Sequence, residues 1–215
     1  NKRVEKERLL AAAKDALKHP LKKLKRQPPA EVSFENAVEE KPFAFPFYQK
    51  ADVLKLAADL NYDVPRVVRA ILETESPMSE EWLLKRICYI FGRDKVTSAV
   101  LKEYAAKMGD YGRHGITLCN GFLYLHGKEI PVLRVPAEGE TPREIKYIAL
   151  EELANGIRAV LKQNVTAEKS GLFKLLAAQL GFARTGDAIT ARLENALQTL
   201  AEEVEIEDDV LSLKD

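Results

Sequence analysis

The chain has 215 residues, of which 46% are hydrophobic and 31% charged, and these proportions are those of folded proteins rather than disordered ones. Its 33 basic and 33 acidic residues cancel, which argues against strong non-specific binding to nucleic acid but leaves room for a local basic patch. Two cysteines, Cys88 and Cys119, are too few for a disulfide framework and predict reduced thiols in a cytoplasmic protein. The sequence has no secretory signal and no run of about 18 apolar residues, so we expect no membrane partner. Because the chain opens at Asn1 without a methionine, we expect it to be a piece of a larger protein.

The first part of the sequence predicts a helix, a linker and a second helix. Residues 3–18 are rich in Ala, Leu, Lys and Glu, which favour a helix, and Pro20 interrupts it. Residues 26–47 are rich in Pro and Phe and predict a linker, and a short helix is expected at 48–60. A basic run lies in the same part of the chain, at Lys14, Lys18, Lys22, Lys23, Lys25 and Arg26. It could follow a nucleic-acid backbone, but a solvated linker is the simpler interpretation.

Two segments of the sequence are similar at a constant spacing. Residues 68–108 align without a gap on residues 157–197, which lie 89 positions later. Seven positions are identical, among them Gly92 with Gly181, and most other apolar positions match in kind. We therefore interpret the two segments as copies of one helical unit.

Each copy is predicted to form three helices. In the first copy, Asp63 is a good N-cap for a helix at 64–74. Ser79 can cap a second helix, which Gly92 ends. A third helix is expected at 95–108. Its inward side chains are expected to be Ala99, Val100, Tyr104 and Met108.

The hydrophobic period changes from about 3.6 to about 2 after each third helix. Residues 116–135 hold an Asn-Gly turn at 120–121 between short apolar strands, which predicts a β-hairpin. A second hairpin is predicted from Val204, Ile206, Val210, Leu211 and Leu213. The predicted fold class is therefore mainly α with small β-hairpins, arranged as a tandem winged-helix (helix-turn-helix-like) repeat. A plain three-helix bundle with an added hairpin is the alternative.

These patterns divide the chain into three parts. The parts are an N-terminal helix, linker and connecting helix at 1–62, a first winged-helix-like unit at 63–136 and a second at 137–215.

The sequence offers no pattern for catalysis. It has no G-x-x-x-x-G-K-[ST] phosphate loop, and no lysine follows the glycines of GFARTGD at 181–187. His19, His114 and His126 lack Cys, Asp or Glu partners at metal-ligand spacing. Acidic pairs such as Glu80-Glu81 are adjacent and point apart on a helix, so they make poor general acid and base pairs. We expect no enzymatic activity, no cofactor, no metal and no small-molecule substrate.

Several apolar and glycine positions carry a resemblance to a known family. Glu75-Ser76-Pro77-Met78, followed by LLKRI and Phe91-Gly92, resembles the "EGPI … RI … G" signature of an uncharacterised C-terminal domain of large bacterial superfamily-one helicases. In these proteins the domain often follows a Vsr-like nuclease domain. The second half, with REIKYIALEELANGIRAVL at 143–161 and LLAAQLGFARTGDAI at 175–189, resembles it more closely.

The resemblance covers about residues 48–213, and the first copy departs from it at 93–96, where Arg-Asp-Lys-Val replaces the usual arginine-glycine. It implies a domain that accompanies helicase and nuclease domains in the parent chain, with a role in defence against foreign DNA. It implies no catalytic residue.

Nucleic-acid contact is the remaining chemistry. In a winged helix the third helix enters the major groove and the hairpin touches the backbone. With Val100 at the centre of the buried side and about 100° per residue, Lys95, Ser98 and Lys102 are predicted on the outer face of the third helix. Arg113 and Lys128 lie on either side of the hairpin in the sequence. The same stepping in the second copy turns Arg184 outward, together with acidic side chains. The candidate nucleic-acid-binding residues are therefore Lys95, Ser98, Lys102, Arg113, Lys128 and Arg184, and a solvated charged face is the alternative for them.

Two functions remain open from the sequence. The first is an accessory region that binds DNA or RNA for an attached helicase–nuclease. The second is a protein-interaction or regulatory module that packs on the parent motor without touching nucleic acid. Zero net charge favours the second function, whereas the resemblance and the basic face of the third helix favour the first, which we prefer.

Overall fold

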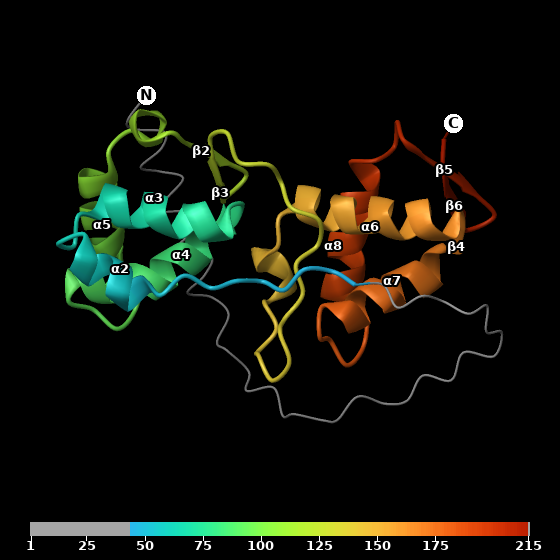
Figure 1. The fold of residues 1–215 in the computed structure, drawn as a ribbon, viewed down its shortest axis with the longest axis horizontal. Helices are drawn as coiled ribbons and strands as arrows, with labels where there is room; N and C mark the ends of the chain where they lie inside the picture. Colours follow the sequence, from blue (N-terminus) through green and yellow to red (C-terminus); the bar gives the residue numbers. More distant parts are fainter. Residues whose placement is uncertain (1–43, 215) are drawn as a thin grey trace. The chain divides into compact units, whose positions relative to one another are not determined.

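A computed structural model describes residues 44–214, which form two compact units. Among these residues, unit 1 comprises 49–129, and unit 2 comprises 44–48 together with 130–214. The described chain thus begins in unit 2, passes through unit 1, and then completes unit 2 (Figure 1). The predicted helix at 3–18 and the basic run at 14–26 lie outside the described residues. None of the helices within the described range is long and apolar enough to cross a membrane.

Unit 1 is mainly helical and carries one small sheet. Its elements are α2 (Val53–Asp59), α3 (Val64–Glu75), β1 (Met78–Ser79), α4 (Glu80–Ile87), η1 (Cys88–Phe91), α5 (Ser98–Met108), η2 (Tyr111–His114), β2 (Ile116–Cys119) and β3 (Phe122–Leu125). The strands pair antiparallel in the order β1-β3-β2. The hairpin strand β3 therefore lies in the middle of the sheet.

Unit 2 has the same order of main elements. They are η3 (Ile145–Tyr147), α6 (Leu150–Asn164), β4 (Thr166–Glu168), α7 (Lys169–Gln179), α8 (Asp187–Gln198), β5 (Val204–Glu207) and β6 (Val210–Leu213). The strands again pair antiparallel, in the order β4-β6-β5. Both units thus run helix, strand, helix, helix, hairpin, and the mainly α fold with small β-hairpins is confirmed.

Local signals in the sequence set several helix ends. Asp63 accepts a hydrogen bond from Arg66 N at the start of α3, and Ser79 accepts one from Trp82 N at the start of α4. Gly92 ends the short helix η1 in the left-handed conformation that glycine adopts without strain. The predictions of both N-caps and of the Gly92 terminus are confirmed.

The two hairpins turn at residues with positive φ. Asn120 and Gly121 connect β2 and β3, as the Asn-Gly pair predicted. Asp208 and Asp209 connect β5 and β6, and both also have a positive φ. Each turn needs only two residues, so each hairpin keeps a fixed register.

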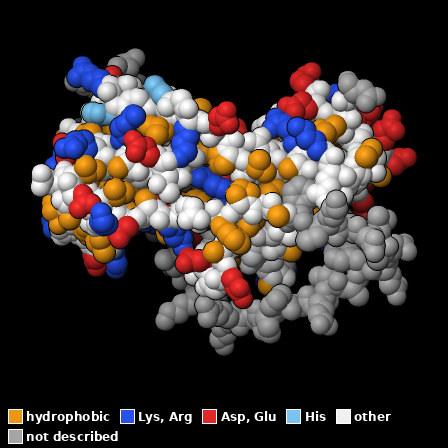
Figure 2. Space-filling model, in the orientation of Figure 1, with side chains coloured by type: hydrophobic (Ala, Val, Ile, Leu, Met, Phe, Trp, Pro, Cys, Tyr) orange, Lys and Arg blue, Asp and Glu red, His pale blue; other side chains and the backbone are white. Residues whose placement is uncertain are grey.

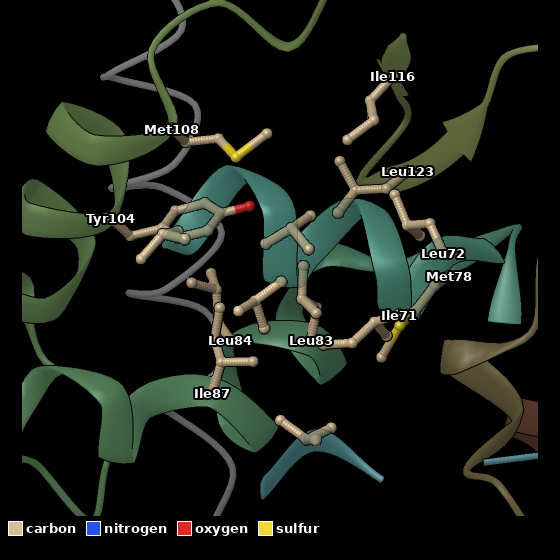
Figure 3. Packing of buried hydrophobic residues seen from close by; sticks show 14 of the residues in the cluster. Ile71, Leu72, Met78, Leu83, Leu84, Ile87, Tyr104, Met108, Ile116 and Leu123 are labelled. Atoms are coloured by element: carbon tan, nitrogen blue, oxygen red, sulfur yellow. The ribbon is translucent and has the colours of Figure 1, made fainter. Parts of the chain in front are cut away.

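Each unit has its own hydrophobic core. Figure 3 shows that of unit 1, where Ile71 and Leu72 of α3 lie among side chains from α4, α5 and the sheet. Tyr104, Leu83 and Leu123 are all fully buried there. In unit 2 the core gathers around α6 and includes Phe45 from the first, short segment of that unit. Apolar burial of this extent is the main stabilising contribution to each unit.

The structure corrects three details of the prediction. The helix expected at 48–60 begins at Val53, because Asp52 caps it and residues 48–52 are not helical. The third helix begins at Ser98 rather than at residue 95, because Thr97 is its cap. Ala99 is exposed and Leu101 is buried in its place.

The strands β1 and β4 were not predicted. Each is two or three residues long, which is too short to show an alternating pattern. The predicted boundary at 136–137 differs from the division of the structure at 129–130, since Leu133 and Val135 pack in the core of unit 2.

Candidate nucleic-acid interface

The outer face of α5 is the central part of the interface that the sequence suggests. The buried side of this helix is held by Val100, Leu101, Tyr104 and Met108. Its exposed residues are Ser98, Ala99, Lys102, Glu103, Ala106 and Lys107. Glu103 and Lys107 pair with each other at 3.1 Å, so among the described residues Lys102 is the cation of this face without an acidic partner. Small side chains around it would let the helix backbone approach a partner closely.

Lys95 and Arg113 lie outside α5. Lys95 is exposed in the loop before the Thr97 cap, so its predicted place on the helix face is wrong. Arg113 is exposed in η2, which Asp110 begins by accepting a hydrogen bond from Gly112 N. None of the acidic side chains in the described part of the chain forms an ion pair with Lys95, Lys102 or Arg113.

Lys128 is engaged within unit 1. Its ammonium group donates to the backbone carbonyl of Glu73, close to the C-terminal end of α3. A cation at this position also suits the helix dipole. This local partner provides a structural role for Lys128, whether or not it meets a phosphate.

The β2–β3 hairpin has little positive charge. Between Ile116 and Leu125 the sequence contains no Lys or Arg. Just after it, His126 contacts Thr117 Oγ1 at 2.8 Å across the hairpin. Contacts between Lys or Arg side chains and a phosphate backbone would therefore come from α5 and its flanking loops rather than from the hairpin.

The matching surface of unit 2 is acidic. Arg184 is exposed in the loop before α8, but Asp187 is exposed at the start of that helix. Glu194 of α8 pairs with Lys169 of α7 at 2.6 Å. Figure 2 shows acidic side chains gathered over the end of unit 2 that carries β5 and β6, whereas Lys and Arg are interspersed with acidic groups on unit 1.

Counts of charged residues agree with this difference. Residues 49–129 hold twelve Lys and Arg against eleven Asp and Glu, while the described residues of unit 2 hold ten against fourteen.

Unit 2 also has an open cleft of about 380 Å³, bordered by Lys169, Phe173, Lys174, Thr190, Glu194 and Asp209. Charges of both signs line it, so it does not favour a simple anion.

The described residues contain no cluster of three or more His, Cys, Asp or Glu side chains that could hold a metal ion. Cys88 is buried, and burial raises the pKa of its thiol, which lowers the thiolate fraction. Cys119 is exposed beside the hairpin turn. Cys88 is therefore poorly suited to act as a nucleophile.

Two buried polar clusters are not indicated by the sequence. In unit 1, the hydroxyl of Tyr111 donates to the buried carboxylate of Glu80 and lies 3.0 Å from the hydroxyl of Tyr104. Burial, with Glu80 close by, raises the pKa of both tyrosines well above its ordinary value. The sequence shows Glu80 only as a favourable charge in the first turn of a helix, because no local pattern announces a partner 31 residues away.

The second cluster lies in unit 2 around Glu152. This carboxylate is fully buried and pairs with Arg134 Nη2 at 2.7 Å and with Arg143 Nη2 at 2.5 Å. Burial opposes its ionisation, but the two arginines outweigh that effect and lower the pKa of Glu152. Both guanidinium groups also face the ring of Tyr48.

Comparison with known proteins gives no significant match to a family model, a curated protein or a solved structure.

Proposed function

We propose that this chain is a non-catalytic, tandem winged-helix region that binds nucleic acid for a larger helicase–nuclease protein. The order helix, strand, helix, helix, hairpin, with the second hairpin strand at the centre of each sheet, supports the winged-helix assignment of both units. The equal spacing of matched helices supports a duplication: α4 and α7 begin at residues 80 and 169, and α5 and α8 begin at residues 98 and 187.

One observation carries the nucleic-acid proposal. Three cations of unit 1 are exposed and form no ion pair with an acidic side chain of the described residues. They lie before, within and after the third helix, at Lys95, Lys102 and Arg113. Exposed cations on and beside the helix that enters the groove are suited to holding phosphates. The attachment to a helicase–nuclease, and a role in defence against foreign DNA, rest on the sequence resemblance alone.

A second candidate function follows from unit 2. Its acidic hairpin would repel a phosphate backbone, which favours a protein partner for this unit. In its full form this alternative makes the whole chain an interaction module that packs on the parent motor. Winged helices serve both purposes, so measured binding has to decide.

The test is binding of the chain to short labelled duplex and single-stranded DNA or RNA while salt is varied. We expect the double variant Lys95→Glu/Lys102→Glu to abolish binding near physiological salt. In a milder pair, Lys95→Gln/Lys102→Gln, each lost phosphate contact should reduce the slope of log affinity against log salt by about one unit. Both lysines are exposed, so the variants should melt within a few degrees of the parent chain.

A matched control on unit 2 is Lys174→Glu/Arg184→Glu, which changes the same charge at exposed positions. It should leave affinity close to that of the parent. Equal loss from both double variants would show that the basic face of unit 1 is not the binding surface. Failure of the parent chain to bind any of the nucleic acids would favour the interaction module.

A further inference from the structure

The first described segment of unit 2 pairs with Val135 through a single isolated β-bridge. Residues 44–48, Ala-Phe-Pro-Phe-Tyr, precede the described residues of unit 1 in the sequence yet belong to unit 2 (Figure 1). Tyr48 N donates to Val135 O at 2.8 Å, and Val135 N donates to Pro46 O at 2.9 Å. These two bonds flank Phe47 and form an isolated parallel bridge with Val135. Short β-pairing of this kind is a common mode of peptide recognition.

Two aromatic side chains anchor the segment. Phe45 is 6% exposed and belongs to the core cluster of unit 2. Tyr48 lies three residues later with its ring centre 4.1 Å from Arg143 Cζ and 5.1 Å from Arg134 Cζ. Phe47, between them, is 56% exposed and contributes little burial. Recognition is therefore concentrated at the first and fourth positions of the sequence Phe-Pro-Phe-Tyr.

The arginines beside Tyr48 are also held by Glu152. Glu152 accepts hydrogen bonds from the backbone N and from Nη2 of Arg134, at 3.0 and 2.7 Å. Arg143 Nη2 donates to Glu152 Oε1 and also to the carbonyl of Arg134, at 2.5 and 2.7 Å. Glu152 and the carbonyl of Arg134 thus orient the guanidinium groups, which offer a preorganised cationic surface to an aromatic ring.

Proline suits the second position of the occupant. Its fixed φ and its effect on the preceding residue hold Phe45 and Pro46 in an extended conformation before docking. Pro46 uses only its carbonyl in the pairing with Val135, so its missing N–H costs no hydrogen bond there. An extended conformation that is already favoured loses less entropy on binding.

We propose that unit 2 carries a peptide-binding site for an extended segment with aromatic residues at positions one and four and proline at position two. Residues 45–48 occupy this site as an intramolecular ligand. A free polypeptide with the same pattern binds there when the resident segment is weakened. This inference does not depend on nucleic-acid binding.

The test uses the full chain with Phe45→Ala/Tyr48→Ala and a fluorescent synthetic peptide of residues 44–50. We expect saturable binding to this variant by fluorescence anisotropy and at least tenfold weaker binding to the parent chain. The parent should resist because its own segment is present at an effective concentration on the order of millimolar. Phe47→Ala is the control variant and should behave as the parent, since Phe47 is exposed.

Peptide chemistry gives a second readout. A peptide in which the tyrosine is replaced by alanine should bind the double variant at least tenfold more weakly, because it has no ring for the arginines. Arg143→Lys in the double-variant background should also weaken binding several-fold, since an ammonium group cannot stack as a plane on the ring. No binding of the native peptide to a folded double variant overturns the proposal, and so does equal binding to variant and parent.

Should the double variant fail to fold by circular dichroism, Tyr48→Ala alone is measured in its place. This variant keeps Phe45 in the core, and it must bind the peptide more tightly than the parent does. Binding no tighter than that of the parent also overturns the proposal.

Discussion

Glu152 shows how one buried side chain can organise its neighbourhood. It is fully buried, yet it is ionised because Arg134 and Arg143 both reach it. Removing one partner of a buried ion pair typically costs on the order of 3–5 kcal/mol, because a charge is left without its partner. We expect Glu152→Gln to destabilise unit 2 by that order, measured as a lowered melting temperature at pH 7.

The difference in stability between the parent and Glu152→Gln should depend on pH. The folded-state pKa of Glu152 is lowered from 4.5, so the stability that its ionisation contributes is fully present above about pH 4.5. That contribution is lost as the pH falls through the folded pKa. The gap in melting temperature between parent and Glu152→Gln should therefore narrow below pH 4.5. A gap that stays constant from pH 7 to pH 3 would contradict the assignment of the charge to Glu152.

Tyr111 and Tyr104 should respond differently to loss of their hydroxyl groups. Tyr111→Phe removes a donor from the buried carboxylate of Glu80, which typically costs about 1–3 kcal/mol. Tyr104→Phe leaves that donor in place and should cost less, about 0.5–1.5 kcal/mol. Urea unfolding of the two variants measures the difference. The reverse order would mean that Tyr104 rather than Tyr111 supports Glu80.

At the scale of helices and strands, the sequence predicts helix caps and turns correctly, because these features depend on residues close together in the chain. Asp63, Ser79 and the Asn-Gly pair each act within a few residues of themselves, so the sequence alone is enough to assign their roles. The predicted start of α5 is wrong because Thr97 caps the helix by accepting a hydrogen bond from Val100 N, and the prediction did not assign that role to it. For the candidate interface, the sequence indicates exposed cations, but it does not indicate that Lys128 binds the end of α3.

Helix packing offers a prediction at two glycines. A Cβ added at Gly156 of α6 would lie 2.9 Å from Leu133 Cβ, whereas one added at Gly171 of α7 would meet nothing within 4 Å. Gly156→Ala should destabilise the protein by about 1–3 kcal/mol through overpacking. Gly171→Ala should stabilise it by up to about 1 kcal/mol, because alanine is the better helix former. Chemical denaturation measures the free energy of unfolding of both variants. A higher value for Gly156→Ala than for the parent would mean that Leu133 shifts without cost.

At the scale of the whole molecule, unit 2 is discontinuous in sequence. The long-range pairs that close it, Phe45 with its core and Tyr48 with the two arginines, join residues more than 80 positions apart. No periodic pattern or motif reports such a pairing, so the sequence predicts a linker at residues 26–47 and a helix that includes Tyr48. The winged-helix-like units are each predicted as continuous for the same reason.

Hydrogen exchange can test this organisation. Phe45→Ala should cost about 3–5 kcal/mol and speed exchange in α6 and α8, whose residues share its core cluster. Exchange in α3 and α5 of unit 1 should stay close to that of the parent, although those helices follow Phe45 more closely in the sequence. Leu54→Ala is the control, since that side chain is 68% exposed. Equal acceleration in α3 and α6 would contradict the division into units.

The insertion of residues 49–129 within unit 2 also sets an order of events during synthesis. All of these residues leave the ribosome before the later part of unit 2, which contacts Phe45 and Tyr48, has been synthesised. At about 5–20 residues per second, the segment waits on the order of ten to thirty seconds for α6 and α8 to emerge. During that interval the nascent chain displays an unpaired Phe-Pro-Phe-Tyr sequence to chaperones and to neighbouring chains on the same messenger RNA. Residues 45–48 can therefore pack in unit 2 only after α6 and α8 have been translated.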